Sequence, residues 1–134
     1  MKVSKVAIVT KFGSKKSEKA AGGIVEKLLK QKFKVYTVSP VLVEGAKKVN
    51  SLEDLSKIKL DLVITLGGDG TTLRTFRNLE NETPLLAINV GGNRGILAEI
   101  NLDEIDTAIQ RIKKNEIWLD KRTRVVASCN GKQF

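Results

Sequence analysis

The sequence contains no histidine and a single cysteine, Cys129, among its 134 residues. One cysteine cannot form an internal disulfide, and without histidine the usual zinc-binding sets and histidine-based catalysis are excluded. Any general base must then be a carboxylate, and we expect Cys129 to be a small core residue. The sequence also has no apolar run of about 20 residues and no recognisable signal peptide, so we expect a cytoplasmic protein with no membrane partner.

Aromatic residues are scarce as well, at 4% of the chain, and this bears on the formal net charge of +9. Residues 1–66 carry 14 lysines against 6 acidic residues, whereas residues 67–134 carry 10 basic and 9 acidic residues. A basic excess can favour nucleic acid through phosphate contacts. However, so few aromatics offer little surface for stacking, and no nucleic-acid-binding module is recognisable. We therefore expect most lysines to coat solvent-facing surfaces, with nucleic acid not a main partner.

Short apolar runs alternate with amphipathic stretches along the chain. The pattern predicts strands at Val3–Val9, Lys34–Val38, Leu60–Leu66 and Leu85–Asn89, helices at Ser17–Gln31 and from Asn101 to about Lys114, and a loop with a short helix near Leu52–Ser56 between Val41 and Lys59. Because several strands are continuously apolar, we predict an α/β fold with a parallel, Rossmann-like sheet covered by helices on both faces. The predicted nucleotide-binding domain is 1–100, followed by a connecting helix at 101–116. The pair Gly22-Gly23 interrupts the first helix and could permit close packing on the sheet.

The most informative segment is Leu62–Arg74, LVITLGGDGTTLR, in which an apolar strand ends abruptly in glycines and a helical pattern resumes. Glycines leave backbone N–H groups uncovered and allow positive φ, so the chain can fold around an anionic oxygen. A helix start adds partial positive charge. The carboxylate of Asp69 would repel a bare phosphate. Its presence therefore indicates that it binds a cation, accepts a proton or holds a sugar hydroxyl. The segment favours phosphoryl transfer; the alternative is an ordinary glycine-rich turn with Asp69 as the helix N-cap.

The GGDG sequence followed by Thr-Thr-Leu-Arg resembles the signature of the NAD kinase family, within a wider group that includes lipid kinases and phosphofructokinases. A second segment, PLLAINVGGNRGILAE at Pro84–Glu99, is similar to the next NAD kinase motif, an apolar strand leading into Asn-x-Gly and a Gly-aromatic-Leu turn. The two motifs together favour NAD kinase over a lipid kinase. The sequence departs from the family at Ile96, where an aromatic residue is usual, which puts a stacking contact with adenine in doubt.

The resemblance implies transfer of the γ-phosphoryl of ATP, or of inorganic polyphosphate, to the 2′-hydroxyl of the adenosine ribose of NAD, giving NADP. Mg²⁺ would be carried largely by the donor phosphates. Asp69 matches the family's catalytic residue and would accept or orient the hydroxyl proton. The predicted donor-binding residues are Gly67, Gly68, Gly70, Thr71, Thr72, Thr10, Lys11 and Arg74. The predicted NAD-binding residues are Asp69, Gly70, Asn89, Gly91, Arg94, Gly95 and Ile96. For Arg74, an ordinary surface position on the helix is an equal alternative.

By resemblance, NAD kinases continue into a second, β-rich domain with an Asn-Glu motif and a Gly-Ser-Thr-Ala-Tyr-like motif, and residues 117–134, where that domain would begin, contain neither. We expect 117–134 to be the first strand of that domain, the resemblance to cover about half of a family member, and the chain alone to be inactive. Full-length members generally form homo-oligomers through the missing domain. A non-catalytic module that senses ATP or NAD remains the alternative function.

Overall fold

One parallel sheet organises the molecule. The computed structural model describes residues 2–11, 13–39, 41–79, 83–90 and 100–116, together with the backbone of 128–129 and 132–133. Within these ranges the strands are Lys5–Thr10 (β1), Lys34–Val38 (β2), Lys47–Val49 (β3), Leu62–Leu66 (β4), Leu85–Asn89 (β5) and Ile100–Asn101 (β6). They form a six-stranded sheet in the order β3-β2-β1-β4-β5-β6, and every neighbouring pair is parallel. This is the strand order of doubly wound, Rossmann-type domains.

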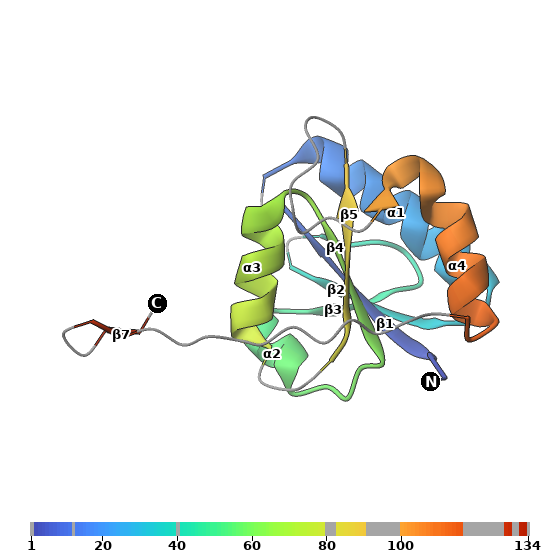
Figure 1. Cartoon of the computed structure of the whole chain (residues 1–134). Helices are drawn as coiled ribbons and strands as arrows, with labels where there is room; N and C mark the ends of the chain where they lie inside the picture. Colours follow the sequence, from blue (N-terminus) through green and yellow to red (C-terminus); the bar gives the residue numbers. More distant parts are fainter. Residues whose placement is uncertain are drawn as a thin grey trace.

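Helices cover both faces of the sheet. The helices are Lys15–Lys30 (α1), Leu52–Ser56 (α2), Asp69–Asn78 (α3) and Ile105–Lys113 (α4), the last preceded by a 3₁₀ turn at Leu102–Glu104 (η1). Seen with β5 towards the viewer, α1 and α4 lie on one side of the strands and α2 and α3 on the other (Figure 1). Along β1, Val6 and Ile8 belong to the core beneath α1, whereas Ala7 and Val9 belong to the core beneath α2. The predicted α/β class with helices on both faces is therefore confirmed.

Helix α1 begins two residues earlier than predicted because Ser14 caps it. The Ser14 Oγ accepts a hydrogen bond of 3.2 Å from the Ser17 N–H, which pairs one of the N–H groups at the helix start. Gly22 and Gly23 do not permit close packing, and that interpretation is wrong. A Cβ built at either position would meet no atom within 4 Å in the described part of the chain.

The prediction missed two strands, β3 and β6. Strand β3 lies inside the segment predicted as a loop, and it pairs only with β2 among the described strands. Its Lys47 and Lys48 are exposed, so it lacks the apolar run by which strands are recognised. Strand β6 is two residues long and extends the sheet beyond β5. The following helix α4 packs its Ile105, Ile109 and Ile112 into the core with α1, so 101–116 forms part of the same α/β unit.

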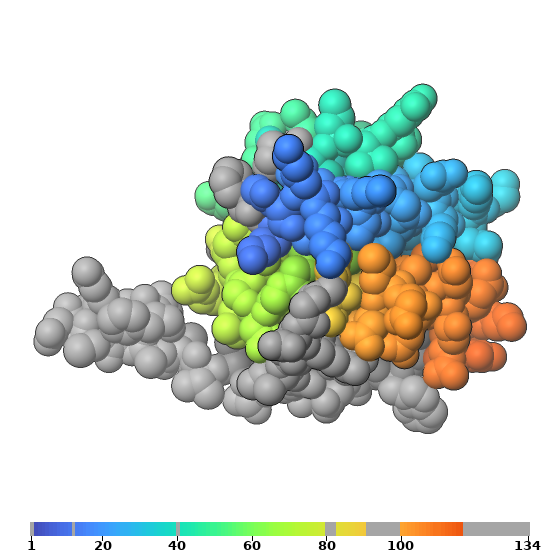
Figure 2. Space-filling view, turned by 90° about the horizontal axis from the view of Figure 1, so that it is seen from above, coloured from blue at the N-terminus to red at the C-terminus, as the bar shows by residue number. Residues whose placement is uncertain are grey.

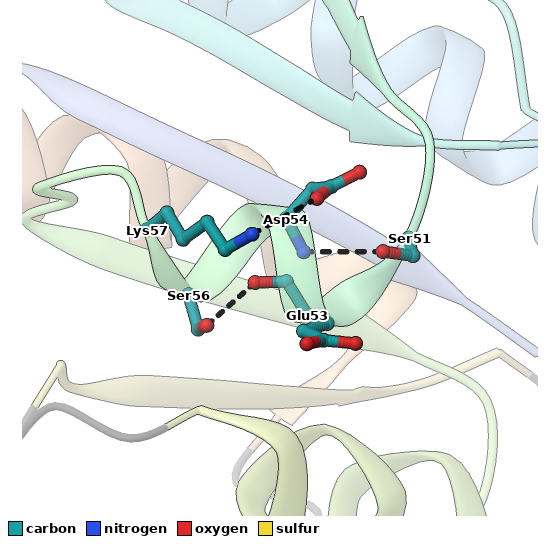
Figure 3. A network of polar contacts seen from close by, with 5 residues as sticks. All are labelled: Ser51, Glu53, Asp54, Ser56 and Lys57. Atoms are coloured by element: carbon teal, nitrogen blue, oxygen red, sulfur yellow. Dashed lines mark hydrogen bonds and ion pairs between the residues drawn. The ribbon is translucent and has the colours of Figure 1, made fainter.

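Helix α2 confirms the predicted short helix at Leu52–Ser56, and local hydrogen bonds account for it (Figure 3). The Ser51 Oγ accepts from the Asp54 N–H at 3.1 Å, and the Ser56 hydroxyl donates to the Glu53 carbonyl at 2.6 Å. An ion pair of 3.7 Å joins Lys57 and Asp54. These contacts hold one and a half turns that would not persist by helix propensity alone.

The end of the chain shows a short antiparallel pairing of Ser128–Cys129 (β7) with Lys132–Gln133 (β8). Residues 117–127 and the side chain of Cys129 lie outside the described residues. The assignment of 117–134 to a second domain therefore stays a prediction. None of the helices in the described ranges combines the length and the apolar character needed to cross a bilayer.

Candidate nucleotide-binding site

The glycine turn lies at the switch point of the sheet, between β1 and β4, where the order in which successive strands are added reverses. The chain runs from β1 through α1 to β2 on one side, and from β4 through α3 to β5 on the other. Domains of this kind bind ligands in the crevice outside the carboxyl ends of the two central strands. Here β1 ends at Thr10 and is followed by Lys11, and β4 is followed by Gly67, Gly68 and the first residues of α3, Asp69 and Gly70. The Lys11 N–H donates to the Leu66 carbonyl at 2.9 Å and ties the two ends together. In the view from above, the blue atoms of the amino-terminal segment lie directly beside the green atoms of α3 (Figure 2).

Gly67 shapes the turn. Its φ is +148°, and a Cβ would lie 2.8 Å from the Thr71 Oγ1, closer than real Cβ atoms come, and 3.0 Å from the Lys11 Cβ, a very tight contact. Its N–H donates to the Ile88 carbonyl at 3.4 Å, which continues the pairing of β4 with β5. Since this N–H already donates within the sheet, the structural role of Gly67 is to allow the sharp bend of the backbone.

Helix α3 begins at Asp69, with Gly68 at the N-cap and no side-chain cap hydrogen bond from the described residues. The alternative in which Asp69 is the N-cap is therefore wrong, because Asp69 occupies the first helical position. The first N–H groups of any helix lack partners within it and point out of its end, where the helix dipole is positive. A Cβ at Gly68 or Gly70 would meet no described atom within 4 Å, so the described residues do not crowd the chain at these two positions.

The hydroxyls of α3 point in different directions. Thr71 is 7% exposed, and its side chain packs against Gly67. The Thr72 Oγ1 lies 3.0 Å from the Thr65 Oγ1 of β4 and 3.5 Å from the Gly68 carbonyl, which places it on the sheet side of the helix. The Thr75 hydroxyl donates to the Thr71 carbonyl at 2.8 Å.

Arg74 reaches from α3 to the end of β1. Its Nη2 donates to the Thr10 carbonyl at 3.3 Å, and its Nε is buried without a hydrogen-bond partner among the described residues. Arg74 is therefore partly buried against the end of β1, and whether it binds phosphate stays a prediction. Its positive charge lies at the same sheet edge as Lys11, which follows β1.

Asn89 is the predicted site residue of the second motif that lies among the described residues. It ends β5, and its Nδ2 donates to the Asn101 Oδ1 at 3.2 Å. Asn101 forms a capping box with Glu104, whose Oε1 accepts from the Asn101 N–H at 3.0 Å. The other predicted residues of this motif, Gly91, Arg94, Gly95 and Ile96, lie outside the described residues.

A shallow cavity of about 580 Å³ lies elsewhere, between the end of α1 and the amino ends of β2 and β3. Its lining includes Lys32, Lys34 and Lys47 around an apolar floor. Because the strands are parallel, this cavity is at the opposite end of the sheet from the glycine turn, and it is not part of the candidate site.

Sequence reasoning missed two residues that hold the site together, Thr65 and Asn101. Thr65 is the one hydroxyl residue in the apolar strand LVITL, and it is 1% exposed. A hydroxyl residue in an otherwise apolar strand, four residues before Asp69, is the sequence feature that could have identified it. For Asn101, the signal was the Asn-x-x-Glu spacing typical of a capping box.

A doubly wound sheet with an open glycine turn at its switch point defines the class of α/β domain that binds nucleotides and phosphates. Residues 6–117 match the family model described as the ATP-NAD kinase N-terminal domain. The chain therefore belongs to the NAD kinase family, as its two motifs predicted.

Similar proteins agree with this assignment. The NAD kinase of Thermoplasma volcanium is 31% identical over 131 residues, and that of Thermoplasma acidophilum is 34% identical over 128 residues. These matches cover 97% and 95% of this chain but only 45% and 44% of the relatives, so the chain spans less than half of their length.

Two solved structures share the fold. Yeast NADH kinase complexed with NADH superposes with a TM-score of 0.72 at 20% identity, covering 87% of this chain and 39% of that one. An NAD kinase from Archaeoglobus fulgidus in complex with ATP gives a TM-score of 0.56 at 21% identity, covering 83% of this chain and 37% of the other.

Proposed function

We propose that this chain is the amino-terminal part of an NAD kinase, which transfers the γ-phosphoryl of ATP or polyphosphate to the 2′-hydroxyl of the adenosine ribose of NAD. The observation that carries the proposal is the open GGDG turn at the switch point of the sheet, inside the segment that matches the family.

The donor phosphates bind at the start of α3. Backbone N–H groups of Gly70 and Thr71 face the open end of the helix, and Gly68 and Gly70 carry no side chain that would keep an oxygen away. Lys11 and Arg74 supply positive charge at the same edge. Mg²⁺ held by the donor phosphates would neutralise part of their charge, a binding mode common for this strongly hydrated ion.

Asp69 acts on the acceptor hydroxyl. A hydroxyl is a weak nucleophile, and the Asp69 carboxylate at the first position of α3 would accept or orient its proton as the new bond to phosphorus forms. Positioning and charge neutralisation supply most of the remaining catalysis in phosphoryl transfer. NAD would reach this carboxylate over the end of β5, where Asn89 lies, with Gly91, Arg94, Gly95 and Ile96 as further contacts.

The proposed activity belongs to a longer polypeptide than the chain described. Since the chain spans less than half of its relatives, we propose that it binds the donor by itself but forms no NADP. We further propose that the complete enzyme acts in the cytoplasm as a homo-oligomer.

The first test is donor binding by the chain itself. ATP with Mg²⁺ is titrated into ¹⁵N-labelled protein, and the amide signals of Gly68, Gly70 and Thr71 are expected to shift. The amides of Lys34 and Lys47, which line the distant cavity, serve as the internal control. Shifts confined to those two residues would place nucleotide binding at the other end of the sheet and contradict the proposal.

The second test is phosphoryl transfer by a chimera in which this chain replaces the matching part of the Thermoplasma acidophilum NAD kinase. NADP formation is expected, and Asp69→Asn should lower turnover about 10²–10⁴-fold because the base is lost. Asp106→Asn is the matched control, since Asp106 is also an acidic residue in the first turn of a helix. Unchanged turnover in the Asp69→Asn chimera would remove Asp69 from catalysis. ATP binding without any NADP would favour the nucleotide-sensing alternative.

A further inference from the structure

We propose that Thr65 and Thr72 form a hydroxyl relay that fixes the orientation of the Gly68–Asp69 peptide, so that both threonines are positioning residues of the glycine turn. The relevance of this relay to catalysis rests on the proposed function, but the relay itself is a property of this chain.

The relay begins in the sheet. Thr65 is on β4 and is 1% exposed, so its hydroxyl has no access to solvent and needs a partner within the protein. That partner is the Thr72 hydroxyl of α3, with 3.0 Å between the two Oγ1 atoms. A buried hydroxyl on a central strand is thus joined directly to the first turns of the helix that follows the glycines.

The relay ends at a backbone carbonyl of the turn. The Gly68 carbonyl accepts from the Thr72 N–H at 3.3 Å and is contacted by the Thr72 hydroxyl at 3.5 Å. The hydroxyl contact is long for an O–H···O hydrogen bond. It acts beside the backbone bond from the same residue, so Thr72 approaches this carbonyl with two donors.

The direction of the protons follows from counting them. Each threonine hydroxyl carries one proton and can accept through its lone pairs. If the Thr72 proton is directed to the Gly68 carbonyl, the bond between the hydroxyls must be donated by Thr65. In that arrangement the relay runs from Thr65 through Thr72 to Gly68, from the sheet towards the turn.

The peptide that the relay holds is the one that faces the ligand. The Gly68 carbonyl and the Asp69 N–H belong to one planar unit and point in opposite directions. Fixing the carbonyl towards α3 therefore aims the Asp69 N–H out of the helix end, to the side where we propose that the donor phosphates bind. Gly68 has no side chain to restrict its own dihedral angles. The backbone bond from the Thr72 N–H turns its carbonyl towards α3, and the hydroxyl relay adds a second restraint on the same carbonyl.

The test compares three variants of the 134-residue chain. Thr72→Val removes the hydroxyl and keeps the shape, Thr72→Ser keeps the hydroxyl, and Thr65→Val removes the first member of the relay. The matched control is Thr37→Val, because the Thr37 hydroxyl is 0% exposed, donates to the Val41 carbonyl at 3.1 Å and lies on β2 away from the turn.

Two measurements separate positioning from general stability. The residual dipolar coupling of the Asp69 N–H reports the orientation of the peptide without any ligand, and calorimetry gives the affinity for ATP with Mg²⁺. We expect Thr72→Val and Thr65→Val to change the coupling and to weaken ATP binding about 3–10-fold, the range that one hydrogen bond supplies. Thr72→Ser should restore both, and Thr37→Val should alter neither. The double variant should bind no more weakly than either single variant, because the relay acts as one unit.

A wild-type coupling in Thr72→Val would overturn the relay, as would an equal loss of affinity in Thr37→Val. If the wild-type chain binds no ATP, the proposed function at this turn fails, and the coupling still decides whether the relay exists.

Discussion

Replacing Gly70 by alanine should stabilise the protein and at the same time weaken its binding of ATP. Gly70 is the second residue of α3, is not among the glycines with positive φ, and a Cβ there would meet no described atom within 4 Å. Alanine can therefore adopt the native backbone, while it has less conformational freedom in the unfolded chain. The expected gain is about 0.5–1 kcal/mol in the free energy of unfolding, or roughly 2–4 °C in melting temperature for a chain of this size.

The same Cβ would stand where donor phosphates must approach the N–H groups of α3. A methyl group that keeps an oxygen out of hydrogen-bond distance should lower the affinity for ATP with Mg²⁺ at least about tenfold, equivalent to about 1.4 kcal/mol. Scanning calorimetry measures the first effect and titration calorimetry the second. The opposite signs are the diagnostic result, because a variant that simply misfolds would lose both stability and binding.

Gly22→Ala provides the matched control. Gly22 is in α1, and a Cβ there also meets no described atom within 4 Å, so the substitution should give a similar stabilisation. It lies away from the turn, and ATP affinity should stay at the wild-type value. If Gly70→Ala binds ATP as tightly as the wild type and the Gly22→Ala control, phosphates do not bind at the start of α3 and the site has been misassigned.

Other substitutions test separate parts of the structure. Gly67→Ala should destabilise the chain by more than about 1 kcal/mol, because its Cβ would collide with Thr71 at a φ of +148°; an unchanged melting temperature would show that the turn can take another path. Hydrogen bonds from the backbone N–H groups of Lys5 and Ser4 hold the pKa of Asp61 below its ordinary value of 3.8. Its contribution to the free energy of unfolding is therefore present above that pH and is lost as the pH falls through the lower, folded-state pKa. Asp61→Ala should therefore lower the free energy of unfolding at pH 7 and flatten the acid limb of the stability curve, whereas parallel curves for the two proteins would argue against this carboxylate.

The sequence patterns that predicted the fold correctly were those with strong local causes. The apolar run before Gly67 has both faces buried, so strand β4 and the turn that ends it could be located from the residues alone. Strand β3 could not, because Lys47 and Lys48 are exposed and are held in the sheet only by pairing with β2. The strand conformation of such residues is determined by pairing with a neighbouring strand, which overrides their own weak preference for strands.

The candidate site shows the same division. The glycines and Asp69 are recognisable from composition and spacing, because only glycine suits a backbone that must be approached closely. The contact of Arg74 with the Thr10 carbonyl joins residues 64 positions apart, and the bond from Asn89 to Asn101 depends on strand pairing. Neither can be derived from spacing along the chain, since both arise only after the strands are ordered in the sheet.

The hydrogen bonds that flank the glycine turn bear on how fast a ligand can bind. The Lys11 N–H donates to the Leu66 carbonyl, and the Gly67 N–H donates to the Ile88 carbonyl, so the sheet pairing reaches the start of the turn from both neighbouring strands. A binding loop held in this way has little conformational entropy left to lose when a phosphate arrives. We therefore expect association with ATP to be governed by diffusion and charge attraction, with a rate that falls as salt is added, and not by slow closure of the turn around its ligand.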